Sequence, residues 1–252
     1  MSGYTAESEK QRILSDAKEN GVRFIDLEFV DITGASKMTE IPVARLDEAL
    51  EHGMWFDGSS IQGFVRICES DMFLVPDPKT YSIIPWTSGA SRTARLICDV
   101  YTAERQPFAG DPRYVLKQQL ARAAEKGYQL FTGPELEFFI FKSTNGGSLS
   151  PEATQVHDSA GYFDATTNDA AVELRRRIVP AMESMGLTIE MAHHEVAPGQ
   201  HEIDFKYGEA LTTADWVMTY KNVVRTMAQS IGLHASFMPK PIAGINGSGM
   251  HV

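Results

Sequence analysis

The stretch Gly133-Pro134-Glu135-Leu136-Glu137-Phe138-Phe139-Ile140-Phe141 places two carboxylates inside an apolar, aromatic run. The opening Gly-Pro pair and the aromatic and β-branched residues predict a buried strand. Because side chains alternate along a strand, Glu135 and Glu137 share one face, while Leu136 and Phe138 share the other. The sequence therefore predicts a strand with one apolar face and two carboxylates on the opposite face.

Two adjacent carboxylates on such a strand repel each other and lose hydration, and a bound cation would relieve both costs. An edge strand with one solvated face would hold the same glutamates without any ligand. The strand by itself does not distinguish these alternatives. Further carboxylates later in the chain favour the cation.

Size and composition indicate a soluble globular protein. The chain has 252 residues, of which 43% are hydrophobic and 22% charged, enough for one large or two ordinary domains. Its formal net charge of −10 argues against a general nucleic-acid binder. Cys68 and Cys98 lie in apolar surroundings, which predicts buried free thiols in a reducing compartment. With no apolar run of transmembrane length and no signal-peptide pattern, we expect a cytoplasmic protein without a membrane partner.

The first hundred residues predict a small α+β unit. Apolar periodicity and turn residues indicate two helices and five strands in this part. The expected helices are 5–20 and 42–52, and the expected strands are 22–30, 37–41, 72–75, 82–86 and 94–101.

The segment Phe56-Asp57-Gly58-Ser59-Ser60 is rich in turn-forming and polar residues. A loop of this kind on a rigid scaffold is a common place for functional side chains. The alternative is a tight hairpin turn, because Asp-Gly is a strong hairpin signal.

A linker-like segment predicts a domain boundary near Gln106, which gives domains 1–106 and 107–252. Asp111-Pro112 is typical of a helix start, with an N-cap followed by proline. After the Glu135 strand, residues 142–160 predict a long loop. The remaining elements are expected at 168–185 (a helix kinked at Pro180), 187–192 and 200–206 (strands), and 212–231 (a helix with a Thr-x-x-Asp cap).

Two more carboxylates follow in the sequence HHEVAPGQHEIDF, where Glu195 ends one strand and Glu202 lies on the next. The Pro198-Gly199 turn between them predicts a hairpin that brings the two side chains together. With Glu135 and Glu137 they form a set of four carboxylates that suits Mg²⁺ or Mn²⁺ better than zinc. His251 offers one imidazole to a mixed site.

The remaining histidines and the glycine-rich segment have simpler interpretations. For His193 and His194 we favour ring nitrogens satisfied by backbone hydrogen bonds. His157, His201 and His234 are interpreted as surface or packing residues. Residues 243–249 are glycine-rich but lack a dinucleotide fingerprint and a Walker lysine, so they indicate only a sharp turn or a close backbone approach.

Four ordered segments together resemble the class I glutamine synthetases. Phe56 to Ser60, followed by Glu69-Ser70-Asp71 and Leu74, is similar to the N-terminal signature of that family. Lys240 to His251 is similar to its nucleotide-site signature, and GPELEFFIF and HHEVAPGQHEIDF match the metal-binding segments between them. The resemblance covers nearly the whole chain.

The resemblance implies ATP-dependent ligation of ammonia to L-glutamate through γ-glutamyl phosphate, with Mg²⁺ or Mn²⁺ at two sites and ATP as co-substrate. It implies that one metal is held by Glu137, Glu195 and Glu202, and the second by Glu135 and His251.

Further roles follow from the same resemblance. Asp57 and Glu195 are the implied catalytic carboxylates, and Asp57, Ser60, Tyr162 and Glu195 form the implied ammonium pocket. Asn246 and Gly247 match positions that bind glutamate, and Glu190 and Tyr207 match nucleotide-site positions. Arg66 and the seven-residue step from Glu195 to Glu202 resemble the subtype inhibited by glutamine.

The implied architecture is a β-grasp-like N-terminal domain followed by the first part of a catalytic domain with a curved antiparallel sheet. The family assembles as a dodecamer with active sites shared between subunits. A sixth metal ligand, substrate-binding arginines and a flap glutamate are expected beyond Val252. We therefore expect the 252-residue product not to turn over and the intact gene to encode more. Two alternatives remain: a γ-glutamyl ligase acting on a polyamine or another amine, and a non-catalytic module of the same fold.

Overall fold

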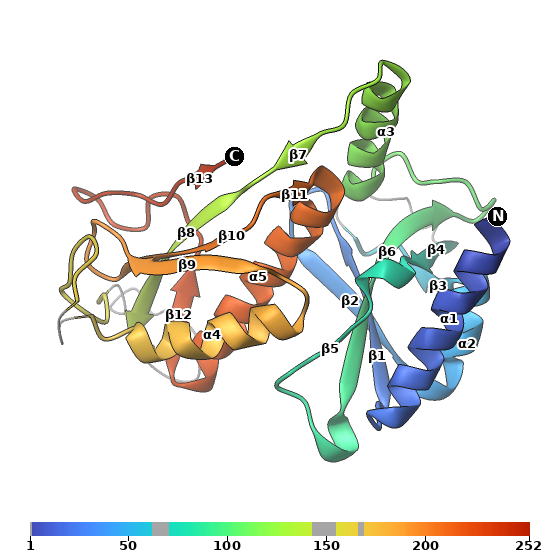
Figure 1. Ribbon diagram of the computed structural model, residues 1–252, viewed down its shortest axis with the longest axis horizontal. Helices are drawn as coiled ribbons and strands as arrows, with labels where there is room; N and C mark the ends of the chain where they lie inside the picture. The colour runs from blue at the N-terminus through green and yellow to red at the C-terminus, as the bar shows by residue number, and fades with distance from the viewer. Residues whose placement is uncertain (1, 62–70, 143–154, 166–168) are drawn as a thin grey trace. The chain divides into compact units, whose positions relative to one another are not determined.

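The computed structural model describes residues 2–61, 71–142, 155–165 and 169–252 (Figure 1). It contains two compact units, Met1–Gln129 and Leu130–Val252, each with its own sheet and apolar core. Of the two cysteines, Cys98 is free and buried as predicted, and Cys68 lies outside the described residues. No helix in the described part of the chain is both long and apolar enough to cross a bilayer.

The first unit is built on a six-stranded mixed sheet. Its order is β2 (Ser36–Pro42), β1 (Phe24–Val30), β6 (Thr93–Thr102), β4 (Asp71–Pro76) and β3 (Met54–Asp57), with β5 (Ser82–Ile83) paired to β6. The central strands β1 and β6 run parallel, and the other pairs are antiparallel. These strands confirm the expected α+β unit.

Helices cover one face of this sheet (Figure 1). Ile13 and Ala17 of the first helix are fully buried against Ile25 and Leu27 of β1, and Leu46 of the second helix joins the same core. In the described part of this unit, the helical segments are α1 (Ser2–Glu19), η1 (Val43–Arg45), α2 (Leu46–His52), η3 (Pro78–Thr80), η4 (Gly89–Ser91) and α3 (Pro112–Glu125).

One expectation and one alternative interpretation for this unit were wrong. Pro42 is the extended last residue of β2, and the 3₁₀ turn η1 precedes α2, so the predicted helix starts later. Asp57-Gly58 does not form a tight hairpin, because β3 continues to Asp57 and Asp71 of β4 lies opposite it. The segment that joins these paired strand ends is therefore longer than a tight turn.

The second unit contains a five-stranded antiparallel sheet. Its order is β12 (Leu233–Ser236), β8 (Glu135–Lys142), β10 (Gln200–Phe205) and β9 (Ile189–His194), with β13 (Met250–His251) paired to the start of β8. A separate pair joins β7 (Phe131–Thr132) to β11 (Gly208–Glu209). The strand predicted around Glu135 is thus central, with partners on both sides.

The alternation predicted for β8 is confirmed. Its residues Leu136 and Phe138 pack with helices α4 (Val172–Ser184) and α5 (Ala210–Ser230), which lie side by side (Figure 1). Within this core, the Tyr220 hydroxyl donates a hydrogen bond to the carbonyl oxygen of Leu136 at 3.0 Å. The helix-facing side of the sheet is therefore dry, and the glutamates face the other side.

Both helices of this unit differ from expectation at their first turn. Helix α4 begins at Val172 rather than 168, because the Asp169 carboxylate accepts hydrogen bonds from the Ala171 amide and Arg175 in a preceding turn. Helix α5 begins at Ala210, so Thr212 lies inside it and the predicted Thr-x-x-Asp cap is wrong. Pro180 does lie within α4, and the bend there stays a prediction.

One buried carboxylate in the first unit predicts a pH-dependent stability. Burial, together with the nearby charges of Glu28 and Glu40, raises the pKa of Asp26 to about 7. A folded-state pKa above the unfolded value means that the folded chain binds the proton more tightly. Stability from this group is therefore full at low pH and is lost as pH rises towards 7, by up to about 1.4 kcal/mol per pH unit.

We expect Asp26→Asn to flatten the decline in the free energy of unfolding between pH 5 and pH 7.5, measured by urea denaturation. Glu40→Gln, which removes one repelling charge, should move the same decline to lower pH. An Asp26→Asn variant with the parent's slope would contradict this assignment.

Candidate metal centre

Carboxylates from three neighbouring elements meet on the open face of the second sheet. In the strand register, Glu202 of β10 lies directly opposite Glu137 of β8 on one side and His193 of β9 on the other. Directly paired residues on antiparallel strands project from the same face. Glu195 follows β9 immediately, so the hairpin adds its carboxylate to the row.

The histidine of this row lies close to two of its carboxylates. His193 Nε2 lies 3.4 Å from Glu202 Oε2, and His193 Nδ1 lies 3.4 Å from Glu195 Oε1. One ligand atom from each of these three residues falls within 4.8 Å of the others, a spacing compatible with a shared cation. The structure thus brings together Glu137, Glu195 and Glu202, as the sequence predicted, and adds His193.

Burial and the nearby negative charges disfavour the ionised form of these carboxylates. Burial, then repulsion from Asp204, Glu195 and Glu137, raises the pKa of Glu202 to about 8. Its Oε1 atom is buried without a hydrogen-bond partner. Burial also raises the pKa of Asp204, although His193 opposes the shift. A divalent cation would supply both the missing partner and the missing positive charge.

A second group of possible ligands forms where β13 meets β8. His251 is the register partner of Glu135, and its Nε2 lies 3.9 Å from Glu137 Oε1. A Cβ atom at Gly249 would come within 3.2 Å of both Glu137 Oε1 and His251 Nε2. The absence of a side chain at Gly249 therefore keeps the space between these two ligand atoms open.

Gln200 links the glutamates to the glycine-rich segment, a role that the sequence did not suggest. Its amide nitrogen donates to Glu137 Oε2 at 2.6 Å and to the carbonyl oxygen of Gly247 at 2.9 Å. At Gly247, a Cβ atom would collide with the backbone oxygen of Pro239. The neighbouring Asn246 is exposed. The close backbone approach expected for this segment is thus present at Gly247.

Three other predicted site residues of this unit lie at the surface. Tyr162 stacks on Phe163 with ring centroids 4.0 Å apart, and it makes an edge contact with His193, with ring centroids 5.7 Å apart, beside the carboxylates. Glu190 is exposed on β9 and contributes to the charge around Asp204. Tyr207 is exposed and makes an edge contact with the Phe131 ring.

The remaining predicted residues belong to the first unit. Asp57 ends β3 with an exposed side chain, and hydrogen bonds from the Ser59 side chain and amide lower its pKa. Ser60 lies exposed in the turn that follows. Arg66 lies outside the described residues.

The histidine interpretations were correct in part. The rings of His193 and His194 do contact backbone oxygens. His193 Nδ1 lies 3.2 Å from the carbonyl oxygen of His194, and His194 Nδ1 lies 2.6 Å from the carbonyl oxygen of Glu195. Because neighbours on a strand face opposite sides, His193 also joins the carboxylates, while His194 turns away. Of the two alternatives given for His157 and His201, surface or packing, the structure shows packing, because both side chains are buried next to Asp158.

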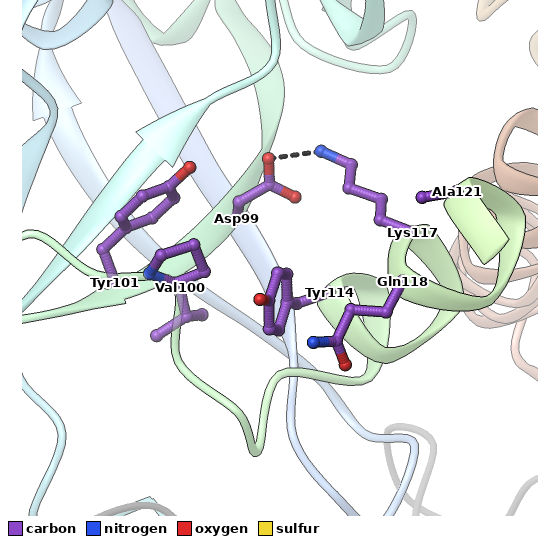
Figure 2. A pocket seen from close by; sticks show the side chains of 8 residues that line it. Asp99, Val100, Tyr101, Tyr114, Lys117, Gln118 and Ala121 are labelled. Atoms are coloured by element: carbon purple, nitrogen blue, oxygen red, sulfur yellow. Dashed lines mark hydrogen bonds and ion pairs between the residues drawn. The ribbon is translucent and has the colours of Figure 1, made fainter. Parts of the chain in front are cut away.

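A separate cavity of about 320 Å³ lies in the first unit, between the end of β6 and helix α3 (Figure 2). Its one ammonium group, on Lys117, is paired with Asp99 at 2.5 Å, and two tyrosine rings and the Gln118 amide border the rest. None of the predicted site residues lines it. The lining residues are Asp99, Val100, Tyr101, Pro107, Tyr114, Lys117, Gln118 and Ala121.

The crowded carboxylates predict opposite effects of one substitution on stability and on ion binding. We expect Glu202→Gln to raise the melting temperature in EDTA at pH 8.5 by several degrees, because it removes a buried charge. The same change should weaken Mn²⁺ binding, measured by calorimetry, at least tenfold.

The matched control is Glu183→Gln, which alters an exposed residue of α4 and should change neither quantity. A Glu202→Gln variant that is less stable than the parent without metal, or that binds Mn²⁺ equally well, would refute this account.

Comparison with known proteins agrees with the fold. A family model described as glutamine synthetase, beta-Grasp domain, matches residues 21–103, and one described as glutamine synthetase, catalytic domain, matches residues 109–252. A glutamine synthetase of Clostridium saccharobutylicum is 54% identical over 252 residues, which are 100% of this chain and 55% of that protein. One from Halobacterium salinarum is 50% identical over 252 residues, which are 99% of this chain and 55% of that protein.

Solved structures give the same result. A cryo-EM structure of Plasmodium falciparum glutamine synthetase aligns with a TM-score of 0.84 at 26% identity, over 98% of this chain and 52% of that one. A structure described as apo GmaS without ligand aligns with a TM-score of 0.83 at 30% identity, over 94% and 55%. The chain spans about half the length of the relatives it matches. It belongs to the glutamine synthetase family, with a β-grasp domain followed by catalytic-domain sequence.

Proposed function

We propose that this chain carries part of the active site of a glutamate–ammonia ligase, which joins ammonia to L-glutamate at the expense of ATP through γ-glutamyl phosphate. The observation that supports this proposal best is the row of Glu137, Glu202 and His193 across three strands, extended by Glu195 and flanked by His251. Such a set of oxygen ligands with few nitrogens suits Mg²⁺ or Mn²⁺.

In this proposal Glu137, Glu195 and Glu202 hold one cation, and Glu135 and His251 hold the second. The unpartnered Oε1 atom of Glu202 and the open space at Gly249 support the fit. When bound, the cations would neutralise charge on the phosphoryl group during its transfer. Gln200 would hold Glu137 in one orientation through its hydrogen bond at 2.6 Å.

The chain's own polar groups would bind the other reactants. Ammonium requires acceptors, and Asp57, Ser60, Tyr162 and Glu195 are the acceptors we assign to it. Its deprotonation to the nucleophile needs a carboxylate base, a role we give to Asp57 with Glu195. We assign Asn246 and Gly247 to glutamate, and Glu190 and Tyr207 to the nucleotide.

Further proposals concern the whole protein. We place it in the class I, glutamine-feedback-inhibited subtype, with Arg66 as the inhibitory contact. We also propose a domain boundary near Gln106, a cytoplasmic location and a dodecamer whose active sites are shared between subunits. These proposals rest on the family and on the sequence motifs.

A γ-glutamyl ligase acting on a polyamine or another amine is the second candidate, since the fold and the phosphoryl chemistry are the same. The Asp57 segment favours ammonia, because a carboxylate with hydroxyl neighbours suits a small cation. A non-catalytic module is less well supported, since all five ligand residues predicted within this chain are present.

The amine specificity predicts the outcome of an ADP-release assay on the full-length protein. With ATP, glutamate and Mg²⁺, we expect strong activity with ammonium and little with methylamine or putrescine. Asp57→Asn should lower kcat with ammonium by about 100-fold or more, as loss of a general base does. Asp47→Asn, at an exposed position of α2, is the control. High activity with an amine and none with ammonium would instead identify the second candidate.

The subtype predicts a regulatory phenotype. Arg66→Ala in the full-length protein should abolish inhibition by glutamine while leaving kcat within about twofold of the parent, because the residue is assigned to the inhibitor and not to the reaction. Unchanged glutamine inhibition in this variant would exclude Arg66 as the feedback contact.

A further inference from the structure

A buried network around Asp158 lies behind the carboxylate row. The Asp158 side chain is fully buried, and its Oδ1 accepts hydrogen bonds from the Gly199 amide at 2.7 Å and from His194 Nε2 at 3.1 Å. The other ring nitrogen of His194, Nδ1, donates to the carbonyl oxygen of Glu195 at 2.6 Å. The Asp158 carboxylate is thus bonded to both sides of the turn between β9 and β10. It binds Gly199 directly and Glu195 through the His194 ring.

The same network joins this turn to β8. The Gly199 carbonyl oxygen accepts from the Ile140 amide at 2.8 Å, while the amide of His157, next to Asp158, donates to the Ile140 carbonyl oxygen at 3.3 Å. Gly199 has a φ of +73°, and a Cβ atom there would lie 2.8 Å from the Cβ of Val156. This packing fixes the turn at a short distance from the strand that carries Glu135 and Glu137.

His194 contacts an acceptor through each of its ring nitrogens. One acceptor is the Asp158 carboxylate at 3.1 Å, and the other is the carbonyl oxygen of Glu195 at 2.6 Å. Hydrogen bonds to a carboxylate are stronger than those between neutral groups and hold geometry more tightly. Both side chains are buried, so loss of either partner leaves a buried polar group without its hydrogen bond.

A metal site at His157, Asp158 and His201 is the competing interpretation, since one ligand atom from each lies within 4.8 Å of the others. The hydrogen bonds argue against it. Arg175 can only donate, and its Nη1 lies 2.9 Å from His201 Nδ1, so the neutral ring carries its proton on Nε2. That atom faces Asp158 Oδ2 at 3.8 Å and has no lone pair for a metal.

We propose that Asp158 is a positioning residue, which acts through His194 and Gly199 to hold Glu195 and Glu202 at the spacing a divalent cation requires. His194 lies on the opposite face of β9 from His193, so the network acts from behind the carboxylates and touches neither the cation nor the substrates. The proposal rests on the metal centre of the proposed function. Partners of this kind commonly change metal affinity about 10- to 100-fold when removed.

The test compares Asp158→Ala with Asp111→Ala in the full-length protein. Asp111 is the matched control, because it is a buried aspartate of the first unit whose carboxylate accepts two hydrogen bonds, from the amides of Val100 at 3.0 Å and Arg113 at 2.9 Å. Mn²⁺ affinity is measured by calorimetry, and amide hydrogen exchange is followed at residues 195–200. Asp158→Asn, which keeps an acceptor oxygen but loses the charge, tests for partial rescue.

We expect Asp158→Ala to lower Mn²⁺ affinity at least tenfold and to speed exchange at residues 195–200, with Asp158→Asn in between. Asp111→Ala should destabilise the chain without either effect. Unchanged Mn²⁺ affinity in Asp158→Ala, or an equal loss in Asp111→Ala, would overturn the proposal.

Two further outcomes are separable. If the parent chain binds no Mn²⁺, the metal centre of the proposed function fails, and with it the link to metal spacing. Exchange at residues 195–200 then shows whether Asp158 holds the turn at all. If Asp158→Ala does not fold, the same two measurements, Mn²⁺ affinity and hydrogen exchange at residues 195–200, are compared between Asp158→Asn and Asp111→Asn.

Discussion

Mutual repulsion of buried carboxylates is the constraint on which the second unit depends. Glu137 and Glu202 lie opposite each other on adjacent strands, and Asp204 and Glu195 add charge to the same region. Such an arrangement costs stability in a low-dielectric environment, and a folded chain keeps it only if other interactions hold the strands in place. Strain of this kind is typical of a site built for a cation.

The compensating interactions lie on the opposite face of the sheet. There Leu136 and Phe138 of β8 pack against α4 and α5, in a core that includes the fully buried Tyr220. Full burial of one large apolar side chain contributes about 1.5–3 kcal/mol, so a few of them offset the cost of one crowded carboxylate. The two faces of β8 are therefore complementary, since one provides stability and the other carries the carboxylates.

A third set of contacts consists of side-chain hydrogen bonds around the carboxylates. Gln200 connects Glu137 to the Gly247 carbonyl, and the Asp158 network connects the β9–β10 turn to β8. These polar contacts add orientation, which apolar packing alone does not supply, because each hydrogen bond fixes a direction as well as a distance. In a metal site, the positions of the coordinating side chains commonly depend on such residues, which do not contact the metal themselves.

The sequence by itself determined the local features. Period-two alternation located the Glu135 strand and its two faces, and Asp111-Pro112 marked the start of α3 where the structure has it. The ordered motifs were enough to identify the family and the fold. The predicted starts of α2 and α5 were wrong. A 3₁₀ turn precedes α2, and α5 begins without a side-chain cap.

Only the tertiary structure decided which residues meet across strands. The register that sets Glu202 between Glu137 and His193, and the clustering of His194 and His201 around Asp158, join segments far apart in the chain. Nothing in local composition encodes a cross-strand partner, since register is set by the packing of the whole sheet. For that reason the sequence alone predicted the carboxylates of the site, whereas the contacts of Gln200 and Asp158 with their neighbours emerged only from the fold.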